Sequence, residues 1–213
     1  MKTMFLARPV ATTLALAALL LPAAVLAAKN ATPSGAAQTG AAQLGSVQTG
    51  TAQTAPETHP LGDIPDSQAF VRYITASAGY SLEVPEGWAR SGSGAGITFT
   101  SKLNQVALHS SLASPALTLA FVRSGILAPL AKADPSLKVT TLKTVQLPAG
   151  PAILARFTSA GASNEVTGRK ETLENDLYVI TRGAKQLVVR LSAPLNSDNV
   201  DAWNQIAHSV VWK

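Results

Sequence analysis

The 213-residue chain contains no cysteine. It can form neither a disulfide framework nor a thiolate metal site, and a lipid-anchored lipoprotein is excluded because no thiol is present to be acylated. A small exported domain without such cross-links is only marginally stable. Any folded part of this chain must therefore be large enough to be stabilised by a hydrophobic core.

The motifs of common enzyme classes are also absent. No G-x-S-x-G pentad occurs, no H-E-x-x-H motif occurs, and His59, His109 and His208 stand far apart. The sequence therefore predicts no catalytic, cofactor-binding or metal-binding residue and favours a protein that is not an enzyme. One alternative stays open, a secreted hydrolase that would use Ser77 or Ser93 with His109 or His208.

The glycine-rich stretch Gly92-Ser93-Gly94-Ala95-Gly96 resembles a phosphate-binding loop only superficially. A phosphate-binding loop needs a helix after its glycines, so that backbone N–H groups and the helix dipole meet the anion. The stretch in this chain also lacks the lysine of the motif G-x-x-x-x-G-K-[ST]. The following residues, 97–100, alternate as a strand does. The stretch is therefore predicted to be a flexible loop.

Charge is neither clustered nor strongly one-sided. Glu171, Glu174 and Asp176 could bind a hard cation such as Ca²⁺, but the D-x-D-x-D-G spacing is missing, and such a cluster is typical of a solvated surface. The basic residues are scattered apart from Arg169-Lys170, whereas nucleic-acid binders carry a basic face. We expect neither a metal nor a nucleic-acid partner.

Residues 1–27 have the order of a secretory signal peptide. Lys2 and Arg8 precede an apolar run, which ends in small residues around a cleavage point after Ala27. A retained membrane anchor is the alternative, since the run is nearly long enough to span a bilayer. With cleavage, no stable membrane span remains, the net charge falls to +3 (15 basic and 12 acidic residues), and the protein is exported to the periplasm or beyond the cell.

Residues 28–60 are composed mainly of Ala, Gly, Gln, Thr, Ser and Pro, with an imperfect repeat of the form AAQTG. Such a segment has too few apolar side chains to offset an ordering entropy of about 1–2 kcal/mol per residue. We interpret it as a disordered linker, which leaves residues 61–213 as one domain.

The front of this domain reads as short strands. Residues 68–74 are apolar with a β-branched bias, and in residues 80–84 Tyr80, Leu82 and Val84 share one face. Pro85 ends that strand, a turn follows, and Trp88 is expected to fold back over the apolar face. Further strands are predicted at residues 97–100 and 106–109.

The middle of the domain is ambiguous. Ser114-Pro115 could begin a helix, but Leu117, Leu119 and Phe121 alternate and favour a strand, followed by a short helix over residues 126–132. Residues 139–147 and 152–157 are predicted to pair as a hairpin.

The C-terminal part carries the clearest patterns. Residues 177–181 and 186–191 flank Gly183-Ala184, and a two-residue loop there would place Ile180 opposite Leu187, Tyr178 opposite Val189 and Thr181 opposite Gln186. A helix after Pro194 is predicted, with Asn196 or Ser197 as its cap and with Asp198 and Asp201 near its positive end. Its expected apolar stripe consists of Val200, Trp203, Ile206, Ala207 and Val210.

Two of these stretches resemble PsbP-like domains, a family named for an extrinsic subunit of the photosynthetic oxygen-evolving complex. They are GYSLEVPEGW at residues 79–88 and TRGAKQLVVRLSAP at residues 181–194, the second followed by a helix and Ser209-Val210-Val211-Trp212. The resemblance covers residues 68–213 and implies an α+β fold in which helices sandwich an antiparallel sheet. No family binding residue matches a position here.

The sequence thus favours an exported, non-enzymatic binding or accessory module of the cell envelope, acting through contacts with another envelope or exported protein. A small-molecule or lipid carrier is a further alternative, and it would need a cavity between sheet and helix.

Overall fold

The computed structural model describes residues 62–75, 77–113 and 116–213. The predicted signal peptide (1–27), the linker (28–60) and His59 lie outside these residues. No helix in the described ranges is both long enough and apolar enough to cross a bilayer.

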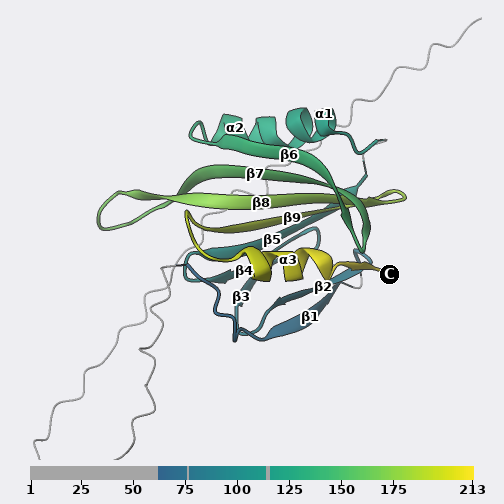
Figure 1. Cartoon of the computed structure of the whole chain (residues 1–213), viewed down its shortest axis with the longest axis horizontal. Coiled ribbons are helices and arrows are strands. Elements are labelled where there is room, and N and C mark those ends of the chain that lie inside the picture. The colour runs from purple at the N-terminus through teal and green to yellow at the C-terminus, as the bar shows by residue number, and fades with distance from the viewer. Residues whose placement is uncertain (1–61, 76, 114–115) are drawn as a thin grey trace, which may run out of the picture.

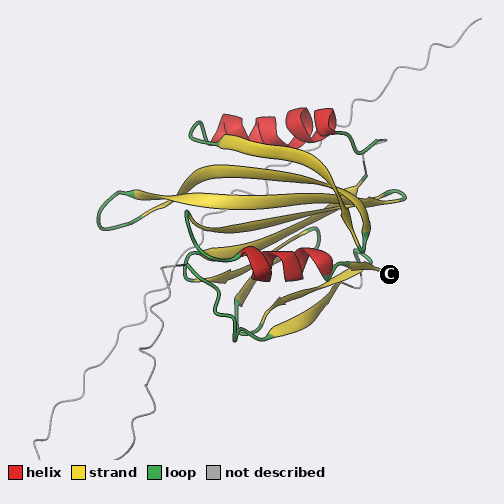
Figure 2. Ribbon diagram, viewed as in Figure 1, coloured by secondary structure: helices red, strands yellow, loops and turns green. Residues whose placement is uncertain are grey.

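The described residues form two antiparallel sheets and two helical segments (Figures 1 and 2). The smaller sheet has the order β1-β2-β10, with strands β1 (Phe70–Thr75), β2 (Tyr80–Pro85) and β10 (Val211–Trp212). The larger has the order β3-β4-β5-β9-β8-β7-β6, with strands β3 (Ala89–Ser93), β4 (Gly96–Ser101), β5 (Asn104–Leu112), β6 (Lys138–Leu147), β7 (Gly150–Ser163), β8 (Lys170–Arg182) and β9 (Lys185–Pro194). The helical segments are α1 (Leu119–Phe121), η2 (Val122–Leu127) and α2 (Ala128–Ala133), which run on from one another, and α3 (Val200–His208).

Both faces of the larger sheet are covered by helix, and each face has its own hydrophobic core. Tyr178 and Ile180 of β8 pack with α3 and the small sheet, whereas Leu177 and Val179 pack with η2 and α2. Figure 1 shows the two helical segments on opposite sides of the strands. The predicted α+β fold, an antiparallel sheet sandwiched by helices, is confirmed.

The predicted β8–β9 hairpin is confirmed residue by residue. Ile180 pairs with Leu187, Tyr178 with Val189 and Thr181 with Gln186, around a turn at Gly183-Ala184. The residue Gly183 has φ 58°, a left-handed conformation that glycine adopts without steric cost. A slip of one residue would exchange the sets of side chains that the two cores require, so packing and turn select the same register.

The other predicted hairpin, between β6 and β7, also forms, with Leu147 paired to Gly150 across a two-residue turn. Both strands extend beyond the predicted limits. In the small sheet, Tyr80, Leu82 and Val84 are buried as expected, and Trp88 packs against the same core.

The strand expected at Leu117, Leu119 and Phe121 is wrong, because a helix begins there. Thr118 caps it by accepting a hydrogen bond from the Phe121 N–H (3.1 Å). Buried residues then recur every four positions at Val122, Ile126 and Leu130, which is a helical period and outweighs the local alternation. The short helix predicted at 126–132 is present but begins earlier, while Ser114-Pro115 lies outside the described residues.

Pro129 is accommodated inside this helical segment by a change in its hydrogen-bond spacing. Pro129 has no N–H. The π-helical segment η2 ends two residues before it, and there the Ala128 N–H donates to the Arg123 carbonyl, five residues back.

Two details of the predicted α3 are wrong. Its N-cap is Asn199, not Asn196 or Ser197, and Val200 is 56% exposed, outside the buried stripe. Trp203, Ile206 and Ala207 are buried as predicted. The chain reaches the helix through Asn196, which has φ 70°, so the helix starts later than the sequence suggests and Val200 faces away from the core.

The glycine-rich stretch is more ordered than predicted. Gly92 and Ser93 end β3, and Ser93 pairs with Gly96 across a tight turn at Gly94-Ala95. The last glycine, Gly96, begins strand β4, which includes the predicted strand at residues 97–100, so no helix N-terminus is presented to a phosphate.

Candidate functional site

The outer face of the small sheet exposes two apolar side chains in one row. Ile74 of β1 pairs with Ser81 of β2, and Ser81 pairs with Val211 of β10. Ile74 is 52% and Val211 49% exposed. Successive residues of a strand point to opposite faces, so the burial of Tyr80 and Leu82 in the core places Ser81, Ile74 and Val211 on the outer face. Ser81, in the middle of the row, is only 3% exposed.

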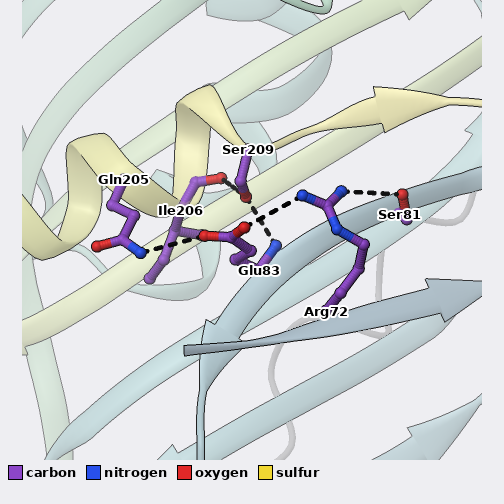
Figure 3. A network of polar contacts seen from close by, with 6 residues as sticks. All are labelled: Arg72, Ser81, Glu83, Gln205, Ile206 and Ser209. Carbon is purple, nitrogen blue, oxygen red and sulfur yellow. Dashed lines mark hydrogen bonds and ion pairs between the residues drawn. The ribbon is translucent and has the colours of Figure 1, made fainter. Parts of the chain in front are cut away.

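Beside this row lies a polar network that joins the small sheet to α3 (Figure 3). The Arg72 guanidinium forms an ion pair with Glu83 (Nη2 to Oε1, 3.1 Å) and donates to Ser81 Oγ (3.4 Å). The other carboxylate oxygen of Glu83 accepts a hydrogen bond from Gln205 Nε2 of α3 (3.1 Å). Glu83 therefore holds one residue of β1 and one of α3 at the same time.

Ser209 attaches the end of α3 to the same strand. Its Oγ accepts a hydrogen bond from the Glu83 N–H (2.7 Å) and donates to the Ile206 carbonyl (2.8 Å). Side chains held at both ends lose little freedom when a partner binds. We call this surface, made of Ile74, Val211, Arg72, Glu83 and Gln205, the small-sheet face.

Sequence reasoning identified no residue of this face as functional. The alternation of residues 80–84 does turn Glu83 outward, and that was the available signal. The contact with Gln205 could not have been found, because the two residues lie 122 positions apart and meet only through the packing of α3.

A hollow of about 290 Å³ opens between β6, β7, β8 and the first turn of α3. In its lining, Arg156 forms a two-oxygen ion pair with Asp176 (Nε to Oδ1 3.0 Å, to Oδ2 3.2 Å). Leu195 and Val200, both also in the lining, are 45% and 56% exposed. The lining therefore combines three charged residues with apolar ones.

The acidic cluster is divided by the strand that carries it. Glu174 and Asp176 line this hollow. Glu171 lies an odd number of residues from both on β8, so its side chain points to the opposite face of the sheet. Burial raises the pKa of Asp176, opposed by the charge and hydrogen bond of Arg156. Burial also raises the pKa of Glu174, opposed by the N–H groups of Asn196 and Ser197. Among the described residues, these carboxylates form no group suited to a metal ion.

The residues of the hydrolase alternative are distributed over several elements. Ser77 follows β1, and His208 ends α3 with Nδ1 against the Asn204 carbonyl (2.8 Å). Ser93 and His109 do share a row of the large sheet, but Gly96 lies between them, about 9–10 Å separating their Cα atoms at normal strand spacing. Burial alone lowers the pKa of His109, whereas a catalytic base is normally oriented by a third group.

Comparisons with known proteins give the fold. No family profile and no curated protein matches the chain. The solution structure of cyanobacterial PsbP (CyanoP) from Synechocystis sp. PCC 6803 matches 72% of this chain and 99% of its own length, with 16% identity and a TM-score of 0.53.

Two further structures are similar at lower scores. The Saccharomyces cerevisiae Ran-binding protein Mog1p matches 68% of this chain and 96% of its own, at 10% identity and a TM-score of 0.49. LpqN, involved in cell envelope biogenesis of Mycobacterium tuberculosis, matches 68% and 85%, at 18% identity and a TM-score of 0.40. Likeness at this level of identity concerns the fold and not the activity. By the match to CyanoP, the described part of this chain has a PsbP-like fold.

Proposed function

We propose that this protein is an exported, non-enzymatic binding or accessory module of the cell envelope. In this proposal residues 1–27 direct export and are removed, residues 28–60 form a flexible linker, and residues 61–213 form the PsbP-like domain that binds another envelope or exported protein. The observation that carries the proposal is the small-sheet face, which combines exposed apolar side chains with polar groups already held in place.

The composition of this face suits protein binding. Interface centres combine apolar anchors with arginine, and a polar rim surrounds them. On the small-sheet face, Ile74 and Val211 supply the apolar anchors and Arg72 supplies a guanidinium whose orientation Glu83 holds. A partner therefore pays little conformational entropy to order these groups.

The edge of the same sheet supports the proposal independently. β1 is the outermost strand in the order β1-β2-β10, so one edge of its backbone has no strand beside it among the described residues. Free strand edges bind extended segments of partner proteins by adding a strand to the sheet.

The test is a matched set of charge insertions in the full chain. Ile74→Glu with Val211→Glu places carboxylates on the small-sheet face, while Val166→Glu places one on an exposed position (93%) between β7 and β8. Each protein is expressed in its native host, fractionated, cross-linked and used to capture envelope proteins, and a captured protein is then titrated against purified chain.

We expect the protein in the envelope or extracellular fraction and a specific partner whose affinity falls at least tenfold with the double variant but not with Val166→Glu. Equal binding by wild type and double variant would reject the small-sheet face. A cytoplasmic location of the mature chain would reject the exported module.

A further inference from the structure

A second hollow, of about 240 Å³, opens on the other side of the seven-stranded sheet, where α2 ends. Strands β7, β8 and β9 contribute Ser159, Lys170 and Arg190 to its lining, and the residue after α2, Asp134, contributes a carboxylate. This hollow is separate from the small-sheet face, which packs on the opposite core.

Arg190 lies in this hollow without a carboxylate in ion-pair contact. Its Nε donates to Asn175 Oδ1 (2.9 Å), one Nη donates to Ser159 Oγ (3.4 Å), and the guanidinium lies over the Phe157 ring (5.4 Å). The ion pairs among the described residues involve Arg72 and Arg156 instead. A guanidinium has five N–H donors, so three remain after these two bonds.

A buried amide fixes the direction of this guanidinium. Asn175 is 2% exposed, and its Oδ1 accepts from both Arg190 Nε and Ser192 Oγ (2.7 Å), while its Nδ2 donates to Ser159 Oγ (3.0 Å). With both ends of the amide bonded, Asn175 has one orientation, and Arg190 is held in place before any ligand arrives.

The other groups of the hollow leave an excess of donors. Ser159 Oγ accepts from Asn175 and Arg190, so its own proton is still available, and Lys170 adds an ammonium group. The hydrogen bonds of Asp134 go to other groups, since Oδ1 accepts from Ser136 (N–H 3.0 Å, Oγ 2.6 Å) and Oδ2 from the Ala160 N–H (2.8 Å). Its charge acts on Arg190 and Lys170 only from beyond ion-pair distance. Two cations and one anion leave the hollow with a net positive charge.

We propose that this hollow is a binding site for a small oxyanion, a carboxylate or a phosphate group, which Arg190 grips with its free N–H groups while Ser159 and Lys170 complete the contacts. A guanidinium matches two oxygens of either group in the same plane. Arg190 is partly buried, which is costly for a cation without an ion-pair partner, and only the more distant charge of Asp134 offsets that cost. A bound oxyanion in direct contact would offset it further. The volume lies below the roughly 300–1,000 Å³ of pockets for drug-sized molecules, so the ligand is small.

The experiment is an NMR titration of the ¹⁵N-labelled full chain with sodium phosphate and, separately, sodium acetate, each replacing sodium chloride at constant ionic strength. The observed signals are the Arg190 Nε–H and the backbone N–H groups of Ala160 and Gly161, which line the hollow. We expect saturable shifts at these signals with at least one anion. Saturation by acetate alone identifies a carboxylate ligand, and saturation by phosphate alone identifies a phosphate ligand.

Matched variants separate the site from general charge effects. Lys170→Gln and Arg169→Gln each remove one positive charge from adjacent exposed positions, but only Lys170 lines the hollow. Lys170→Gln should weaken binding about two- to fivefold, and Arg169→Gln should leave it unchanged. Arg190→Lys keeps the charge without the planar fork and should weaken binding at least fivefold, with folding checked by circular dichroism. Absence of saturable shifts with both anions, or equal weakening by the two glutamine variants, overturns the proposal.

Discussion

Asn199 joins three separate parts of the chain, and its removal should be among the most damaging polar substitutions in the domain. Its buried amide accepts a hydrogen bond from the Ile64 N–H (2.6 Å) and donates to the Gly62 carbonyl (2.9 Å) and to Asn104 Oδ1 (3.3 Å). Although Asn199 is the N-cap of α3, its side chain makes no cap bond. Its role is to hold the segment before β1 against β5 and α3.

The expected cost of Asn199→Ala follows from what remains unpaired. The variant loses three hydrogen bonds, each worth about 0.5–1.5 kcal/mol net, and it leaves the N–H of Ile64 and the carbonyl of Gly62 buried, at about 1–3 kcal/mol for a group without a partner. Since these contributions overlap, we expect the free energy of unfolding to fall by about 3–4 kcal/mol. Against a total of about 5–15 kcal/mol, that is a large fraction.

The assay is equilibrium unfolding in urea at 25 °C, followed by tryptophan fluorescence and circular dichroism. Asn204→Ala is the matched control, because Asn204 is an exposed residue of the same helix, and it should change the free energy of unfolding by less than about 0.5 kcal/mol. Amide exchange at Ile64 should also become faster in Asn199→Ala. A loss below about 1 kcal/mol, or equal losses in the two variants, would refute the reasoning.

Two further predictions concern the helical segment and His109. Ile126→Ala should lower the free energy of unfolding by about 2–5 kcal/mol, because Ile126 is 2% exposed. Leu119→Ala should lower it by less than about 1 kcal/mol, because Leu119 is 39% exposed. A larger loss for Leu119→Ala than for Ile126→Ala in urea unfolding would favour the alternating strand instead. Burial lowers the pKa of His109 in the folded state, so the unfolded chain binds the proton more readily. Stability therefore falls as the pH drops below the unfolded pKa of about 6.5. His109→Gln should make the urea unfolding midpoint less dependent on pH between 7 and 5, and an unchanged dependence would contradict the lowered pKa.

The parts of the fold that sequence reasoning predicted well share one property, a pattern that both local chemistry and burial support. In the β8–β9 hairpin, Gly183-Ala184 suits the turn and the flanking apolar residues suit a strand buried on both faces, so one register satisfies both. At Leu117, Leu119 and Phe121 the local alternation and the burial pattern of the following residues conflicted. The alternation favoured a strand, but the cap at Thr118 and the four-residue spacing of Val122, Ile126 and Leu130 produce a helix.

The candidate sites were not predictable in the same way. Histidines, serines and acidic residues attracted attention because their chemistry is recognisable in a sequence, yet the small-sheet face and the oxyanion hollow depend on Arg72 and Arg190. Neither arginine has a distinguishing local motif. Arg190 follows two valines in what reads as an ordinary strand, and the lack of a carboxylate in contact with it is visible only in three dimensions.

The sequence alone therefore determined the α+β class, the register of the hairpins that have favourable turn residues, and the buried residues Trp203, Ile206 and Ala207 of α3. These features depend on residues close together in the chain. The tertiary structure decided which polar groups meet. Glu83 reaches Gln205, and Asn199 reaches Ile64, only after α3 docks on β2 and on the start of the domain. Contacts across more than a hundred residues are selected by the packing of whole elements, and no local pattern encodes them.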